Sequence, residues 1–158
     1  MIEPRARQFE ERYGTTLTHR LGFGFDGTVM LTRDRHAVKF FTRADAYTHE
    51  LRAYLLIQAG GITEILGHQV PELIRHDDEL QAIEMSVVQP PFLLDFAGAY
   101  PEDEAPDFPP EVWEEWRADK AEQFGDRWAD AERVIDEFRR RVGLVLLDVN
   151  PGNIKFAD

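Results

Sequence analysis

A glycine-rich turn between two strand-like segments constrains the fold of this chain more than any other stretch. Residues 22–29 read Gly-Phe-Gly-Phe-Asp-Gly-Thr-Val, the pattern G-x-G-x-x-G-x-V. Such glycines let the backbone lie close to a ligand, and the backbone amides can then face phosphate oxygens. A dinucleotide-binding βαβ unit needs a helix directly after the glycines, whereas residues 28–32 are rich in β-branched and apolar side chains and typical of a strand. The stretch therefore predicts strands over residues 15–21 and 28–32 joined by a glycine loop, with a flexible hairpin as the alternative.

A lysine lies inside the next apolar strand, which we expect over residues 36–41. Burying the ammonium group of Lys39 is costly unless it meets an anion. That anion could be a phosphate under the glycine loop, or it could be Glu50 on the following helix. We expect Asp45 to cap this helix and Gly60-Gly61 to end it. A Lys39–Glu50 pair would hold the lysine extended toward a nucleotide; the alternative is that Lys39 reaches solvent and Glu50 is a surface acid.

Two further strands, over residues 69–75 and 80–88, complete a predicted set of five antiparallel strands and one helix. The Gln89-Pro90-Pro91 run cannot continue a central strand, so we interpret it as a hinge. Residues 1–91 then form one lobe and residues 92–158 a second.

The second lobe is predicted to be helical over residues 111–142, after an acidic, proline-rich loop at 101–110 that we expect to be mobile. Gly125-Asp126 divides the helical stretch, with the glycine ending one helix and the aspartate capping the next. The tryptophans recur among apolar residues at helical spacing, and we interpret them as part of the core.

The last apolar run leads into a short polar loop. Residues 144–156 predict strand, loop and strand, with Asp148 and Asn153 at the two ends of the loop. A carboxylate and an amide in one small space suit metal-assisted chemistry on a phosphate, with the acid orienting an attacking hydroxyl and the amide oxygen reaching a magnesium ion. A polar turn between two strands is the alternative for this pattern taken alone.

Composition and charge exclude several classes of function. The chain has 158 residues, 43% of them hydrophobic, which is enough for one domain with a core or for two small lobes sharing a cleft. The formal net charge of -12 argues against a nucleic-acid partner. No cysteine is present, and the five histidines show no metal-ligand spacing. The sequence has neither a signal peptide nor an apolar run of membrane-spanning length, so we expect a cytoplasmic protein without membrane contact.

Taken in order, the glycine loop, the Val38-Lys39 strand, the Glu50 helix, the hinge and the Asp148…Asn153 loop resemble the protein-kinase-like superfamily. The Asp-x-x-Pro-Gly-Asn form of the last loop is similar to that of the aminoglycoside and choline phosphotransferases. The resemblance implies an α+β fold with a five-stranded antiparallel N-lobe sheet, one helix and a minimal helical C-lobe. It implies ATP as the cofactor, with Mg²⁺ at a weak or incomplete site. The residues implied for the nucleotide are Gly22, Gly24, Gly27, Val29, Lys39, Glu50 and Met85, with Asp148 as the catalytic base and Asn153 as a metal ligand.

The chain departs from the superfamily pattern in two places. Leu146-Leu147 stand where a His-Arg or His-Gly pair commonly supports the catalytic loop, so we expect that loop to lack polar support. The Asp-Phe-Gly motif, whose aspartate holds the main magnesium ion, is not found, and Asp158 falls too soon after Asn153 to replace it. We therefore expect a domain truncated before that motif, and losing such an electrostatic element typically slows a reaction by about a hundredfold to a thousandfold.

Three functions stay open on the sequence. The first is a kinase-like ATP-binding domain that is a catalytically weak or inactive pseudokinase with a regulatory or partner-binding role. The second is an active phosphotransferase completed by a partner chain or by missing C-terminal sequence, and the third is an interaction module that binds no nucleotide. We also expect a protein partner or a homodimer through the incomplete C-lobe, because Val145, Ile154 and Phe156 would otherwise face water.

Overall fold

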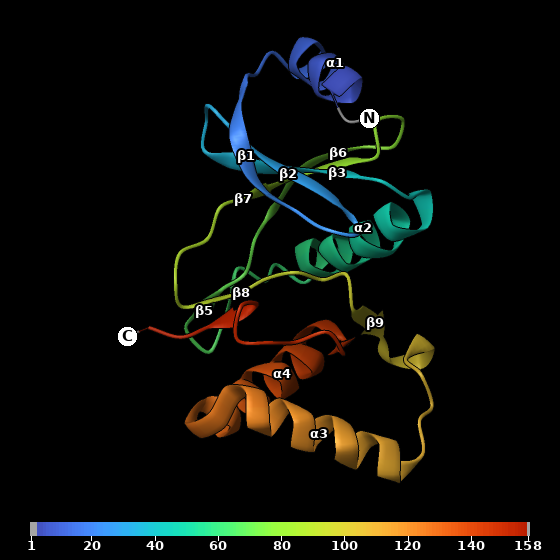
Figure 1. Ribbon diagram of the computed structural model, residues 1–158, viewed down its shortest axis with the longest axis vertical. Helices are drawn as coiled ribbons and strands as arrows, with labels where there is room; N and C mark the ends of the chain where they lie inside the picture. The colour runs from blue at the N-terminus through green and yellow to red at the C-terminus, as the bar shows by residue number, and fades with distance from the viewer. Residues whose placement is uncertain (1–2, 158) are drawn as a thin grey trace. The chain divides into compact units, whose positions relative to one another are not determined.

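A computed structural model describes residues 3–157, and the chain divides into two compact units (Figure 1). The first unit holds the chain up to Gln58 together with Pro71–Val87, and the second holds Ala59–Val70 and the chain from Val88 onward. A division into two lobes at residue 91 stays a prediction, and the sequence does not predict that residues 59–70 join the second unit. None of the helices in the described range is long and apolar enough to span a membrane. Asp158, which we expect not to bind metal, lies outside the described residues.

The first unit is built on a five-stranded antiparallel sheet, which confirms the predicted α+β class. Its strands, in spatial order, are β1 (Leu17–Phe23), β2 (Gly27–Thr32), β3 (His36–Phe41), β7 (Ala82–Ser86) and β6 (Leu73–Asp77). Two helices accompany the sheet, α1 (Glu3–Tyr13) and α2 (Ala44–Ala59). Asp45 lies inside the first turn of α2, so its predicted position as the capping residue is wrong. Gly61, with a φ of 64°, follows the end of that helix as expected.

The two helices cover opposite faces of this sheet (Figure 1). Side chains alternate between the two faces along a strand, so the consecutive residues Phe40 and Phe41 of β3 contact different helices. On one face, Phe9 of α1 meets Phe40 of β3, with ring centroids 5.7 Å apart. On the other face, Phe41 meets Tyr47 of α2, with ring centroids 5.6 Å apart. Lys39 and Phe41 therefore share the face that carries α2.

A buried carboxylate ties α1 to the sheet. Asp77, which is 6% exposed, accepts hydrogen bonds from Tyr13 Oη at 2.6 Å and Arg12 Nη1 at 2.5 Å. It also accepts one from the Leu80 backbone nitrogen at 2.9 Å. Burial alone would raise the pKa of Asp77, but the hydrogen bonds from Tyr13, Leu80 and Arg12 outweigh it and hold the pKa below its usual value.

A proline breaks the strand that the sequence predicts over residues 69–75. Pro71 separates β5 (His68–Gln69) from β6, because proline has no amide hydrogen for the ladder. β5 pairs with β4 (Glu64–Ile65) and with β8 (Phe92–Leu93), in a sheet of order β11-β8-β5-β4 whose other edge is β11 (Ile154–Lys155). This sheet belongs to the second unit. Ile154 is 1% exposed there, so the prediction that it faces water is wrong.

The helical prediction for the second unit is confirmed, apart from one cap. The helices are α3 (Pro110–Phe124) and α4 (Trp128–Val142), joined by the 3₁₀ turn η2 (Gly125–Arg127). Gly125 has a φ of 57° and ends α3 as predicted, but Asp126 lies within η2 and makes no capping hydrogen bond to α4. A second 3₁₀ turn, η1 (Glu102–Glu104), lies in the acidic loop. After α4, β10 (Leu144–Leu146) pairs with β9 (Ala99–Pro101).

Candidate functional site

The first part of the candidate site is an ion pair between β3 and α2. Lys39 Nζ lies 2.9 Å from Glu50 Oε1, as predicted from the sequence. The side chains are 14% and 3% exposed respectively, so both charges are largely withdrawn from water. The lysine nitrogen also lies 4.7 Å from the centre of the Phe41 ring. An ammonium group carries three donors, so Lys39 can donate to a further anion while it keeps the Glu50 bond.

The strand register brings three predicted site residues into one row. Gly22 of β1 lies opposite Val29 of β2, and Val29 lies opposite Lys39 of β3. Directly opposed residues on antiparallel strands project to the same face, so Val29 and Lys39 share the face that α2 covers. Met85 of β7 contacts the same helix, with its sulfur 2.9 Å from Tyr54 Oη.

The glycine loop is held closed from both sides. The Gly24 amide donates to the Gly27 carbonyl at 2.9 Å, so this amide is engaged within the loop. Thr42 makes two hydrogen bonds to the tip of the loop. Its backbone amide donates to the Asp26 carbonyl oxygen at 3.0 Å, and its Oγ1 hydroxyl donates to the Phe25 carbonyl oxygen at 3.1 Å. A Cβ at Gly27 would stand 2.2 Å from the Phe40 carbonyl oxygen, which is why this position requires glycine.

Two of the three loop glycines face open space. A Cβ at Gly22 or Gly24 would meet no atom of the described residues within 4 Å. The neighbouring rings are also open to solvent, with Phe23 72% and Phe25 84% exposed. The loop therefore presents a small, accessible backbone surface beside β2.

The second part of the candidate site is the loop from Leu147 to Asn153 in the second unit. Asn153 Nδ2 donates to the Asp148 carbonyl oxygen at 3.3 Å, which leaves the Asn153 side-chain oxygen as an acceptor. Asn150 organises the turn: its Oδ1 accepts from the Gly152 amide at 2.8 Å, and its carbonyl accepts from the Asn153 and Ile154 amides at 2.9 and 3.1 Å. The Asp148 side chain is exposed at the start of this turn.

Polar support for the loop comes from Gly98 and Trp116, for which the sequence predicts no role in this loop. The Leu147 amide donates to Gly98 O at 3.0 Å, and the Leu147 carbonyl accepts from Trp116 Nε1 at 3.0 Å. The expectation that this loop lacks polar support is therefore wrong. The Asn-Pro-Gly run could have indicated Asn150, because asparagine commonly bonds to the backbone two residues on. The position of Gly98 between apolar residues could have indicated that another backbone segment approaches there, because glycine permits such close approach.

The donors that could hold a metal ion are few. Within residues 3–157, no group of three or more His, Cys, Asp or Glu side chains is arranged to bind one. Asp148 and Asn153 offer a carboxylate and an amide oxygen from one loop. Magnesium is commonly held by one or two carboxylates together with substrate phosphates, so this donor set fits an ion that a nucleotide also ligates.

The two parts belong to different units. The residues implied for the nucleotide all lie in the first unit; they are Gly22, Gly24, Gly27, Val29, Lys39, Glu50 and Met85. Asp148 and Asn153 are together in the second.

Neither a family model nor a curated protein matches the sequence. Among solved structures, a ternary complex of streptomycin, ATP and APH(2'')-IIa is similar with a TM-score of 0.46 and 15% identity, covering 56% of this chain and 29% of that chain. The ADP-bound aminoglycoside phosphotransferase APH(2'')-Ib is similar with a TM-score of 0.44 and 15% identity, over 56% of this chain and 29% of that one. The gentamicin–APH(2'')-IIa complex has a TM-score of 0.44 and 14% identity, over 55% and 28%. The chain thus spans less than a third of the length of these proteins, and likeness at this level carries no conclusion about its ligands or activity.

Proposed function

We propose that the chain is a nucleotide-binding domain of the protein-kinase-like type, with ATP as its ligand and weak phosphoryl transfer, or none, of its own. The observation that carries the proposal is the Lys39–Glu50 ion pair at 2.9 Å. Burying two charges costs several kcal/mol per ion, so a pair of this kind is weak support for stability alone. The pair suits phosphate binding, because Glu50 holds the Lys39 side chain extended and the ammonium group keeps further donors for an anion.

Each of the named residues has a distinct task in this proposal. Lys39 donates to the phosphates, and Glu50 fixes its direction. Gly22 and Gly24 let the loop backbone lie against the nucleotide, and Val29 and Met85 offer apolar contact to the base. Magnesium, when bound, supplies neutralisation of phosphate charge, and Asn153 and Asp148 are the residues that would hold it. A regulatory or partner-binding role follows if transfer is weak, because a nucleotide that is bound and not consumed can act only through the conformation it stabilises.

Titration calorimetry with ATP, in the presence and absence of Mg²⁺, tests the proposal. We expect saturable binding that Lys39→Ala weakens about tenfold to a hundredfold, since hydrogen bonds to charged groups contribute about 1.5–3 kcal/mol. Lys120→Ala removes the same charge from α3 and is the matched control, which should bind as the parent does. If the parent chain binds no ATP with or without Mg²⁺, the nucleotide proposal fails and an interaction module remains.

A second candidate is an active phosphotransferase, and the exposed carboxylate of Asp148 favours it. A base that accepts a proton from an acceptor hydroxyl must be accessible, and Asp148 is exposed on a turn that Asn150 and Asn153 hold. ADP release should then exceed the background and should fall about a hundredfold or more in Asp148→Asn, with ATP binding in the absence of Mg²⁺ unchanged. ATP binding without ADP release, across hydroxyl- and amine-bearing acceptors, would leave the pseudokinase proposal standing.

A further inference from the structure

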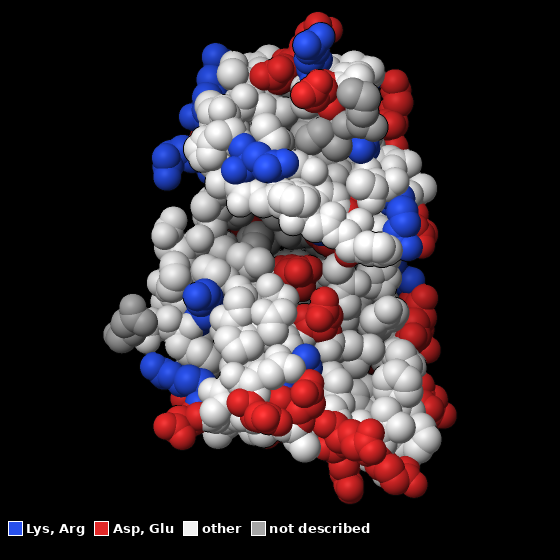
Figure 2. Space-filling model, in the orientation of Figure 1, with Lys and Arg blue, Asp and Glu red and all other residues white. Residues whose placement is uncertain are grey.

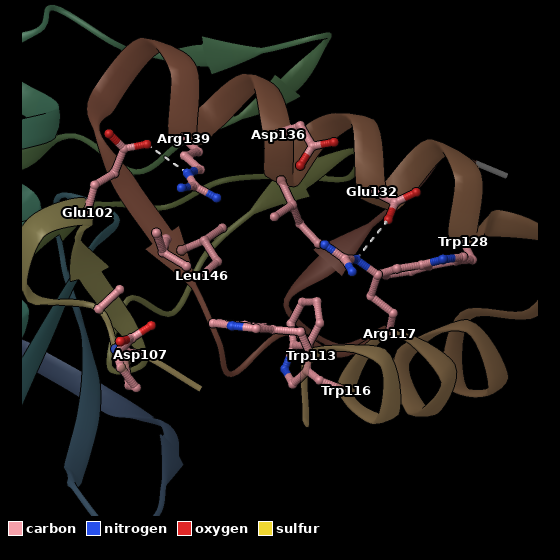
Figure 3. A pocket seen from close by; sticks show the side chains of 14 residues that line it. Glu102, Asp107, Trp113, Trp116, Arg117, Trp128, Glu132, Asp136, Arg139 and Leu146 are labelled. Carbon is pink, nitrogen blue, oxygen red and sulfur yellow. Dashed lines mark hydrogen bonds and ion pairs between the residues drawn. The ribbon is translucent and has the colours of Figure 1, made fainter. Parts of the chain in front are cut away.

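A pocket in the second unit lies between α3, α4 and the acidic loop (Figure 3). Its volume is about 520 Å³, within the range of small-molecule and side-chain binding pockets. Val145 and Leu146 of β10 line it together with Ile135 of α4. Neither Asp148 nor Asn153 is among its lining residues, so it is distinct from the loop described above.

Three tryptophans form part of the wall of this pocket. Trp113 and Trp116 of α3 and Trp128 of α4 all line it, and none of them is fully buried. Their rings form an edge-to-face series, with centroids 6.1 Å apart between Trp113 and Trp116 and 6.3 Å apart between Trp116 and Trp128. The prediction that the tryptophans belong to the core is therefore wrong. Two tryptophans of α3 and one at the start of α4 therefore border a space that no other described segment fills.

The rim of the pocket carries more acidic than basic side chains. Arg139 Nε pairs with Glu102 Oε1 at 2.6 Å, and Arg117 Nε lies 3.9 Å from Glu132 Oε2 (Figure 3). Asp107 and Asp136 also line the pocket and form no ion pair within residues 3–157. Two carboxylates thus remain uncompensated beside three tryptophans. Figure 2 shows acidic side chains gathered over the part of this face that α3 occupies in Figure 1.

We propose that this pocket docks a peptide segment of a partner protein, in which an arginine enters the pocket against the tryptophans that line it and an adjacent apolar side chain packs outside. The guanidinium group stacks on indole faces and donates to carboxylates in a planar fork, so it suits an aromatic pocket with two free acids better than an ammonium does. Cation–π contact contributes about 0.5–2 kcal/mol, and each carboxylate adds attraction.

The apolar surface next to the pocket favours a peptide over a free small cation. The Phe108 ring lies 5.3 Å from the Trp113 ring, and Phe108 is 40% exposed. Val112, beside Trp113 in the sequence, is 38% exposed. An occupant limited to the pocket would leave this apolar surface in water, whereas a segment with leucine or another apolar residue next to its arginine would cover it.

Intrinsic fluorescence tests this proposal directly, because the chain has three tryptophans and all of them line the pocket. The probe is a capped hexapeptide with two arginines and two leucines. We expect saturable quenching by this peptide and about tenfold weaker binding when the leucines are replaced by alanine, since two partly exposed leucines contribute about 1–2 kcal/mol. Replacing the arginines with glutamate should abolish the signal.

The acidic rim is tested by the double variant Asp107→Asn with Asp136→Asn. Both residues are exposed, so the fold should be retained, which circular dichroism checks. Binding should weaken about tenfold, because two charge-assisted contacts are lost. Glu114→Gln with Glu122→Gln removes two exposed acids of α3 that do not line the pocket, and this control should bind as the parent does.

Three results would overturn the proposal. One is equal affinity for the parent and the Asp107/Asp136 variant. Another is tighter binding of ethylguanidinium than of the hexapeptide, which would make the pocket a site for a free cation. A third is a dimer by light scattering that the Asp107/Asp136 variant dissociates, which would make a second copy of the chain the occupant. The proposal concerns a surface separate from Lys39, so it stands or falls independently of ATP binding.

Discussion

Gly98 lies directly against Asp148: a Cβ built on Gly98 would stand 2.5 Å from the Asp148 Cβ and 2.8 Å from its backbone nitrogen. The two residues are 50 positions apart in the numbering, and β9 and β10 bring their segments together. The Gly98 carbonyl also accepts from the Leu147 amide at 3.0 Å. The position of the proposed catalytic carboxylate therefore depends on the absence of a side chain at Gly98.

Gly98→Ala is expected to displace the Asp148 loop. The added methyl group would lie too close to the Cβ and the backbone nitrogen of Asp148, so one of the two segments must shift. Overpacking of this kind costs about 1–3 kcal/mol. We expect a lower free energy of unfolding by urea denaturation. Gly24→Ala is the matched control, because a Cβ there meets no described atom within 4 Å and its stability should change by less than about 0.5 kcal/mol. Equal stability of the two variants would contradict the contact.

Substitutions at Lys39 and Glu50 should affect the free energy of unfolding and the affinity for ATP in different ways. Lys39→Met leaves the Glu50 carboxylate buried beside an apolar side chain, which should cost about 3 kcal/mol. Adding Glu50→Leu removes that charge, and the double variant should recover most of the lost stability. Neither variant should bind ATP with the parent's affinity, so calorimetry and urea denaturation together separate a binding role from a structural one. Recovery of ATP binding in the double variant would contradict the role proposed for Lys39.

Asp77 should make the first unit sensitive to acid. Its folded pKa lies below the unfolded value of about 3.9 because Tyr13, Leu80 and Arg12 donate to it. Its stabilising contribution is therefore present above about pH 4 and is lost as the pH falls through the folded pKa. Asp77→Asn should lower stability by about 1–3 kcal/mol at pH 7, with the difference narrowing below pH 4.

Thermal unfolding followed by circular dichroism at several pH values measures this narrowing. Asp34→Asn, an exposed turn residue of the same unit, is the control and should leave the pH profile unchanged. A constant difference between the parent and Asp77→Asn from pH 7 to pH 3 would contradict the assignment.

Trp116 connects the aromatic pocket to the Asp148 loop through its bond to the Leu147 carbonyl at 3.0 Å. Trp116→Phe keeps an aromatic ring and removes the donor, so stability should fall by about 1 kcal/mol or somewhat more. Trp128→Phe removes an indole whose nitrogen donates to no residue in the described part of the chain, and its effect should be limited to lost packing area. Differential scanning calorimetry compares the two, and an equal effect would show that the Leu147 bond contributes nothing.

Local chemistry explains which parts of the fold the sequence predicts. The glycine hairpin, the Lys39 strand and the helix end at Gly60-Gly61 follow from neighbouring residues alone, because glycine, β-branched residues and helical periodicity act over a few positions. The Lys39–Glu50 pair was predictable for a related reason: a lysine in an apolar strand needs an anion, and the next helix offers one beside its apolar stripe. The errors at Asp45 and Asp126 concern helix ends, where a shift of one or two residues decides whether a side chain caps the helix.

The sequence by itself determined the α+β class, the five-stranded sheet and the helices of the second unit, because residue propensities and periodicity act between near neighbours. Only the tertiary structure decided that residues 59–70 join the second unit, that Gly98 meets Asp148 and that three tryptophans line a pocket. These contacts join segments that lie far apart in the chain. They depend on how whole elements pack, and helical spacing cannot distinguish an aromatic face that meets the core from one that is left open.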